Sequence, residues 1–168
     1  LVGSEMCIRD RATGEEPGLG IGHFITLSEE ECLELLSTRS AGRLAWTQDD
    51  DIELMPVTHH VVGHSLVMRI APNTPMARIG VGQRIAFEVD ELDEATHTGW
   101  DVVARGTVQS VNSYPDEAAV VAAGAPKLTW APGVRRNVMT ISITSLSGRA
   151  VSSDAVSYTH LTLPTIYS

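Results

Sequence analysis

Arg69 and the turn that follows it form the segment of this sequence best suited to bind an anion. Residues 72–75 (PNTP) are typical of a turn, and Pro75 suits the first turn of a short helix over about residues 75–81. The start of a helix presents unpaired N–H groups and a positive dipole end, and arginine carries a fork of donors that fits phosphate oxygens. The plainer interpretation is a solvated arginine on a strand, with Thr74 as a simple helix cap.

The histidines and aspartates do not form a convincing metal site. His59 and His60 are adjacent on a predicted strand, so their side chains point to opposite faces and cannot easily share an ion. His60 and His64 flank a turn, but no carboxylate or cysteine lies at a suitable spacing from them. The aspartates at positions 49–51 lack the remaining ligands of an EF-hand, which favours a solvated turn. We therefore expect no metal site.

No set of side chains in the sequence indicates acid–base or nucleophilic catalysis. Residues 18–22 (GLGIG) resemble a nucleotide loop only superficially, because no strand precedes them and no suitable helix follows directly. There is no serine-elbow motif, and Cys32 lies on the apolar stripe of a predicted helix, where a buried thiol is expected. These absences do not exclude an enzyme, because a bound organic cofactor can supply the reactive group itself.

Composition favours one acidic globular domain. The chain has 168 residues, of which 43% are hydrophobic and 20% charged, and its formal net charge is -9. This charge repels nucleic-acid backbones and anionic membrane surfaces, so neither is expected as a partner. The two cysteines form no disulfide framework, and no apolar run has the length of a membrane-spanning helix. We therefore expect a cytoplasmic location.

The two ends of the chain differ in character from the rest. Residues 1–11 and 156–168 show no periodicity that continues into the middle of the chain, and residues 12–22 are rich in glycine and acidic residues. We expect residues 1–22 and 152–168 to be flexible or non-native extensions, and residues 23–151 to form the folded domain.

Hydrophobic periodicity between the ends predicts short strands and short helices. Ser28 and Glu31 fit a capping box that begins a helix ending near residue 38. Two further short helices are expected over residues 75–81 and 115–123. Alternating patterns predict about six antiparallel strands, over residues 42–47, 52–62, 65–71, 84–90, 100–111 and 137–146. Gly106, inside the fifth of these, is typical of a bulge. The pattern favours a barrel, although pattern alone does not separate a barrel from a sandwich.

The order of these segments resembles the pyridoxamine 5′-phosphate oxidase-like family of FMN-binding split barrels. The resemblance covers roughly residues 27–151, and each stretch that carries it is weak when taken alone. Together and in order they are fairly specific: LSEEECLELLSTRSAGRLAW, MPVT at 55–58, LVMRIAPNT at 66–74, RIAFEVD at 84–90 with TGW and ARG downstream, and WAPG at 130–133.

The resemblance implies a mainly β fold with short helices, a six-stranded antiparallel Greek-key split barrel that forms a homodimer with FMN between the subunits. The backbone of residues 55–58 would run beside the isoalloxazine ring, and Trp100 and Trp130 of the partner subunit would cover the ring or the substrate space. Arg135 or Arg136 would hold the flavin edge or an acidic substrate. The implied cofactor-binding residues are Met55, Pro56, Val57, Thr58, Arg69, Ile70, Ala71, Thr74, Arg78, Trp100, Trp130 and Arg135.

One position departs from the family pattern. Many members have a lysine directly after the threonine of the phosphate turn, where this chain has Pro75. Arg78, one turn along, would have to supply the missing cation. The same family includes members that use the deazaflavin coenzyme and members that bind haem, so both are alternatives to FMN.

The resemblance therefore implies an FMN-dependent oxidoreductase that takes hydride from a small electron donor and passes it to a small planar acceptor. The alternatives are a flavin- or haem-binding module without turnover and an oxidoreductase that uses the deazaflavin coenzyme. True pyridoxamine 5′-phosphate oxidase activity is not expected, because the full set of basic substrate residues cannot be located in the chain.

Overall fold

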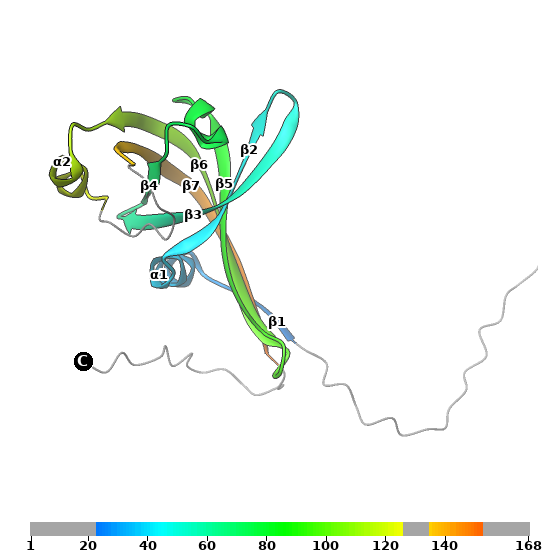
Figure 1. Ribbon diagram of the computed structural model, residues 1–168. Helices are drawn as coiled ribbons and strands as arrows, with labels where there is room; N and C mark the ends of the chain where they lie inside the picture. The colour runs from blue at the N-terminus through cyan, green and yellow to red at the C-terminus, as the bar shows by residue number, and fades with distance from the viewer. Residues whose placement is uncertain (1–22, 126–134, 153–168) are drawn as a thin grey trace, which may run out of the picture.

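The computed structural model describes residues 23–125 and 135–152, and these residues form a mainly β domain (Figure 1). None of its helices is long and apolar enough to cross a membrane. Within the described ranges there are seven strands, two α-helices and one 3-10 helix, in the order β1 (His23–Thr26), α1 (Glu29–Thr38), β2 (Ala41–Gln48), β3 (Asp51–Val62), β4 (Ser65–Ile70), η1 (Pro75–Arg78), β5 (Arg84–Asp93), β6 (Thr98–Ser113), α2 (Glu117–Ala122) and β7 (Asn137–Ser152).

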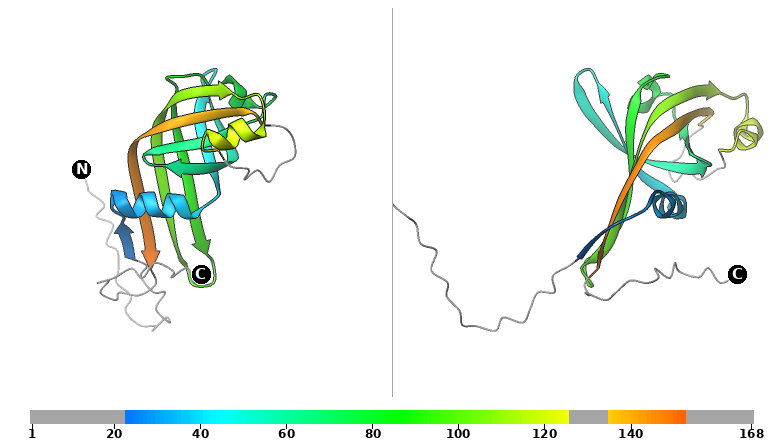
Figure 2. Two further views of the ribbon diagram at one scale, coloured as in Figure 1. Left: turned by 90° about the vertical axis from the view of Figure 1, so that its left-hand side faces the viewer. Right: turned by 180° about the vertical axis from the view of Figure 1, so that it is seen from behind.

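Six of these strands pair in a closed antiparallel ring. The strand order is β1-β7-β4-β3-β2-β5-β6, and an additional pairing of β7 with β6 closes the ring. β2, β3 and β4 follow one another, and β5 returns to pair with β2, which is the strand order of a Greek key. Beyond the ring, β5, β6 and β7 continue as a long arm toward β1 (Figures 1 and 2).

The six strands predicted from alternation are therefore confirmed, although β7 continues to Ser152, six residues beyond its predicted end. β1 was not predicted, because four residues that pair with the end of β7 are too few to show a period. The third predicted helix is confirmed as α2, whereas the helix expected over residues 75–81 is only the single turn η1.

Helix α1 begins at the predicted capping box. The Ser28 backbone N–H donates to the Glu31 carboxylate at 2.7 Å, and the Glu31 N–H donates to the Ser28 hydroxyl at 3.3 Å. Glu29 and Glu30 follow in the first turn, where negative charge suits the helix dipole. The buried side chains of Cys32 and Leu36 hold α1 against the sheet, as the apolar stripe predicted.

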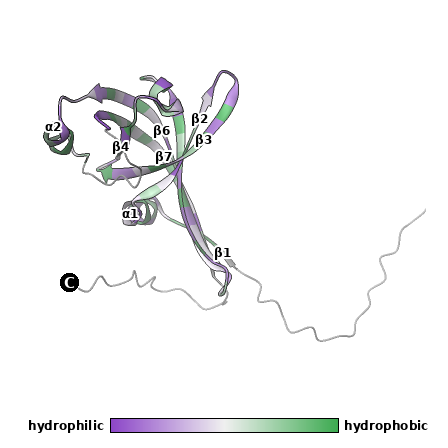
Figure 3. Ribbon diagram, in the orientation of Figure 1, coloured by the Kyte–Doolittle hydropathy of each residue, from purple (hydrophilic) through white to green (hydrophobic). Residues whose placement is uncertain are grey.

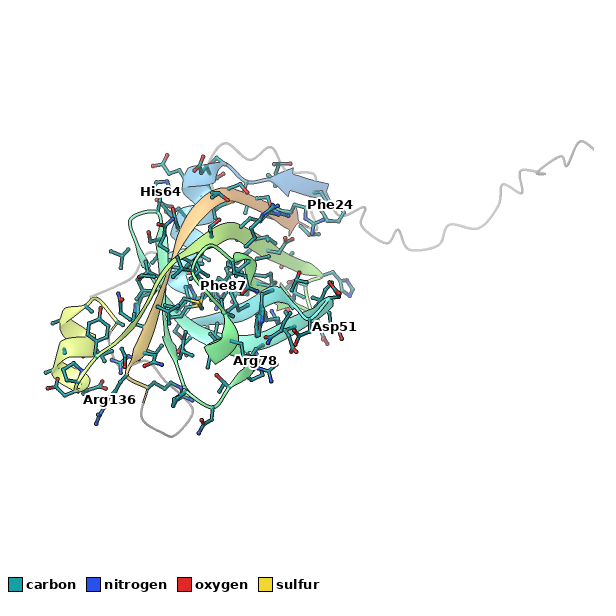
Figure 4. The ribbon with its side chains drawn as sticks, turned by 90° about the horizontal axis from the view of Figure 1, so that it is seen from above. Phe24, Asp51, His64, Arg78, Phe87 and Arg136 are labelled. Carbon is teal, nitrogen blue, oxygen red and sulfur yellow. The ribbon has the colours of Figure 1, made fainter. Side chains whose placement is uncertain are left out.

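The interior of the ring is filled by every second residue of its strands. Figure 3 shows hydrophobic and hydrophilic residues alternating along these strands, as a sheet with one buried face requires. Phe87 lies at the centre of this core (Figure 4). Its largest fully buried neighbours include Leu36, Leu44, Leu66, Met68, Val102, Met139 and Ile141.

β4 departs from this alternation because it is buried on both faces. Leu66, Met68 and Ile70 point into the ring. The residues between them, Val67 and Arg69, are also buried, because a second small cluster formed with Val120, Ala125 and Val138 brings α2 and its following turn onto the outer face. The interpretation of Arg69 as a solvated strand residue is therefore wrong.

β6 contains the bulge that Gly106 indicated. Its pairing with β7 shifts register between Arg105 and Gly106 and again between Val108 and Ser110. A Cβ atom at Gly106 would collide with the Ser142 carbonyl, so glycine allows the two strands to approach here.

Candidate functional site

Although the ring is closed by its strand pairs, the first part of β3 is not paired with β4. β3 pairs with β2 from Asp51 to Thr58, whereas it pairs with β4 only from His59 to Val62. The hairpin of β2 and β3 then diverges from β4 (Figure 1). Residues 55–58 consequently have a neighbouring strand on one side only, and their other edge is available for a ligand.

A cavity of about 270 Å³ lies at this open edge. Its lining comes from β2, β3, β4, the η1 turn and the residue pair before β7: Ala41, Met55, Pro56, Val57, Thr58, Arg69, Ala71, Thr74, Met76 and Arg135. The structure thus brings together most of the predicted cofactor-binding residues. Ala41 and Met76 were not predicted, since a small residue and a single methionine carry no chemical signal in a sequence.

Strand alternation identifies the backbone groups that face the cavity. The His59 N–H donates to the Ser40 carbonyl at 3.1 Å, so the N–H and C=O of His59 point toward β2. Neighbouring strand residues point their backbone groups to opposite edges. The groups of Pro56 and Thr58 therefore point to the open edge. Proline has no N–H, so this edge offers the Pro56 carbonyl as acceptor and the Thr58 N–H as donor.

Arg69 lines the cavity from β4, and its guanidinium is hydrogen-bonded to Glu117 and to the Ala125 carbonyl. Its side chain is only 5% exposed. Nη1 donates to both Glu117 carboxylate oxygens at 2.8 Å, Nε donates to the Ala125 carbonyl at 2.9 Å, and Nη2 donates to the same carbonyl. The pairing with Glu117 was not predicted, because nothing in the sequence indicates which strand residue an acidic residue at the start of a distant helix will meet.

Thr74 precedes η1 but does not cap it with its side chain. The hydroxyl instead donates to the Ala71 carbonyl at 2.9 Å and fixes the turn between β4 and η1. The simple-cap interpretation is therefore wrong, and the hydroxyl remains able to accept a hydrogen bond at the cavity wall.

Three of the predicted residues that the structure describes do not line this cavity. Ile70 points into the ring core. Arg78 is exposed at the far end of η1, 3.7 Å from Asp49, at the periphery in Figure 4. Trp100 lies on the arm, where its Nε1 donates to Glu91 at 3.2 Å and the Arg39 guanidinium stands 5.1 Å from its ring centre. Trp130 lies outside the described residues.

Two histidines follow the cavity residues along β3. The His59 ring is 2% exposed and lies 4.6 Å from the Phe87 ring. Its Nε2 is 2.9 Å from the Leu36 carbonyl, which can only accept, so Nε2 carries the proton and donates. Burial lowers the pKa of His59 below its ordinary 6.5, and burial followed by the charge of Arg69 lowers the pKa of His60. Among the described residues no group of three or more histidine, cysteine, aspartate or glutamate side chains could hold a metal ion.

Acid should destabilise the fold through these histidines. Because their pKa values are lower in the folded chain, the unfolded chain binds protons first as pH falls below 6.5. The free energy of unfolding should then decrease, by at most about 1.4 kcal/mol per pH unit for each histidine. Urea unfolding of the wild type and of His59→Gln between pH 7.5 and 5 measures this. If the free energy of unfolding decreased equally with pH in both proteins, His59 would not contribute to the acid sensitivity.

The chain is 30% identical over 103 residues to an uncharacterized protein, Rv0080, of Mycobacterium tuberculosis, and the match covers 56% of this chain and 65% of the relative. A structure of a conserved protein of unknown function from Corynebacterium diphtheriae is similar with a TM-score of 0.58 and 28% identity, covering 76% of this chain and 97% of the other.

A second similar structure is the FAD-binding protein of Mycobacterium smegmatis, with a TM-score of 0.56 and 23% identity, covering 76% of this chain and 98% of the other. At this identity the likeness concerns the fold. The family model described as pyridoxamine 5′-phosphate oxidase matches residues 28–150, which include all of the ring and the cavity. The chain therefore belongs to the pyridoxamine 5′-phosphate oxidase family.

Proposed function

We propose that this chain binds a flavin nucleotide, FMN in the first instance, in the cavity between β3 and β4 and acts as an oxidoreductase. The observation that carries the proposal is the open edge of β3 beside the buried Arg69. A bound flavin supplies the hydride chemistry, so the protein has to bind, orient and shield it.

The backbone of the open edge matches the polar edge of a flavin. That edge of the ring system has one N–H between two carbonyl oxygens. The Pro56 carbonyl would accept from the ring N–H, and the Thr58 N–H would donate to a neighbouring ring oxygen. These groups come from the backbone of a paired strand, so they are held in place before the ligand arrives.

The side chains around this edge suit a flat apolar ring with a phosphate at one end. Ala41, Met55, Val57 and Met76 supply the apolar wall. Arg69 and Arg135 line the same cavity and carry the positive charge that attracts a phosphate. This arrangement would orient the ring toward β3 and the phosphate toward β4.

A second copy of the chain would complete the site. The cavity, about 270 Å³, is smaller than the roughly 300–1,000 Å³ of pockets that enclose such ligands. Beside it, Ile52 and Leu54 are 78% and 64% exposed on the same face of β3 as Pro56. A subunit packed on this apolar strip would bury it and cover the flavin. Trp100 on the arm is the candidate for the partner's contribution.

Absorption spectroscopy tests the proposal. Protein supplied with FMN should carry flavin absorbance through size-exclusion chromatography and elute as a dimer. Reduced nicotinamide, or another small donor, should bleach the absorbance, and air or a small planar acceptor should restore it. Retained flavin without bleaching would select a binding module, and a Soret band would select haem. Retention of the deazaflavin coenzyme alone would select that cofactor, and a monomer with stoichiometric FMN would contradict the shared site.

A further inference from the structure

Most N–H donors of the Arg69 guanidinium already form hydrogen bonds with acceptors of the protein. Arginine has five N–H donors. The two N–H groups of Nη1 donate to the two Glu117 oxygens at 2.8 Å. One N–H of Nε and one of Nη2 donate to the Ala125 carbonyl. One N–H of Nη2 has no acceptor among the described residues, and it is the donor left for a ligand.

Glu117 also neutralises the charge that this arginine brings to the cavity. Its carboxylate is not part of the cavity lining, and it contacts Arg69 from α2. The Arg69 side chain is 5% exposed and Glu117 is 52% exposed, so water screens the attraction only in part. A phosphate at Arg69 therefore meets an ion pair rather than an unpaired cation.

We propose that Glu117 is a specificity-determining residue that acts through Arg69 and limits how much negative charge the cavity accepts. This inference rests on the proposed flavin-nucleotide site. It predicts that the cavity penalises FMN more when its phosphate monoester carries two negative charges than when it carries one.

The two ligand classes differ in a way that pH can reveal. A phosphate monoester loses its second proton with a pKa of about 6, so FMN carries close to two phosphate charges at pH 8 and about one at pH 5.5. Each phosphate in the diphosphate bridge of FAD carries one negative charge throughout this range. An effect of Glu117 that depends on phosphate charge must therefore change with pH for FMN and stay constant for FAD.

Glu117→Gln removes the charge and keeps a carbonyl oxygen that can accept from Nη1. Flavin fluorescence titrations at pH 8 should show this variant binding FMN on the order of tenfold more tightly than the wild type. At pH 5.5 the gain for FMN should shrink, whereas the gain for FAD should be the same at both pH values. Riboflavin, which has no phosphate, should bind both proteins equally.

Asp116→Asn is the matched control. Asp116 caps α2 by accepting from the Ala119 N–H at 2.9 Å, and asparagine caps as well, so one charge is lost without loss of the helix start. Asp116 has no bond to Arg69 in the structure. Its replacement should change FMN affinity far less than Glu117→Gln does. Thermal unfolding of both variants checks that α2 remains folded.

The outcomes separate this inference from the proposed function. If the wild type binds none of the three flavins, the proposed function itself is wrong. If the wild type binds them and Glu117→Gln weakens FMN and FAD alike, Glu117 only holds Arg69 in position and the charge argument is overturned. An equal gain for FMN in the Asp116→Asn control, or a gain that does not change with pH, would overturn it too.

Discussion

Replacing Arg69 with alanine should weaken FMN binding by about a hundredfold, since a hydrogen bond to a charged group contributes about 1.5–3 kcal/mol. The substitution removes the donor at the phosphate end of the cavity and leaves the charge of Glu117 uncompensated. Riboflavin has no phosphate and should bind the variant and the wild type with similar affinity. Fluorescence titration with both ligands measures the two effects.

The double variant Arg69→Ala, Glu117→Gln is the control for the charge. It should recover part of the lost FMN affinity, because the unpaired carboxylate is gone. Arg69 also donates to the Ala125 carbonyl, so the melting temperature of each variant has to be measured with the titrations. Equal losses of FMN and riboflavin would show that Arg69 supports the fold and does not bind phosphate.

Replacing Thr58 with proline should weaken the binding of every flavin, because it deletes the N–H that the open edge offers to the ring. An acceptor left without its donor costs about 1–3 kcal/mol, which corresponds to about tenfold to a hundredfold in affinity. The effect should be the same for riboflavin and FMN, in contrast to Arg69→Ala. Titration of both ligands against the variant measures it.

Thr58→Val is the matched control, since it changes the side chain and keeps the N–H. It should bind flavins nearly as the wild type does. The Thr58 N–H points away from β2, so the proline variant keeps the pairing between β2 and β3, and circular dichroism can verify this. If valine and proline at this position had the same effect, the side chain and not the backbone would contact the ligand.

Local chemistry predicted most of the secondary structure. Ser28 and Glu31 are three residues apart and satisfy each other's backbone groups, so the start of α1 follows from four residues of sequence. Phe87 and its neighbours on β5 alternate because one face of the strand is buried, and this period is visible without a structure. Gly106 marked its bulge because a side chain cannot fit there.

Contacts between distant segments were not predictable in the same way. Val67 and Arg69 alternate with three core residues and so resemble a solvated face, but α2 covers them from about fifty residues further along the chain. The pairing of Arg69 with Glu117 depends on where this helix packs. Periodicity contains no information about that position.

The candidate site was predicted through the family resemblance rather than through chemistry. Residues 55–58 contain no charged side chain, and their role depends on backbone groups at an open edge. That edge exists because β4 pairs with only the last four residues of β3. Arg78 illustrates the opposite case, since its charge suggested a role at the cavity, yet it stands beside Asp49 at the far end of η1.

A crystal structure of the protein with FMN tests the central claim most directly. The account predicts the ring against residues 55–58, with the Pro56 carbonyl and the Thr58 N–H at its polar edge and the phosphate within hydrogen-bond distance of Arg69. A flavin bound elsewhere on the chain, or a phosphate turned away from Arg69 in the same cavity, would contradict it.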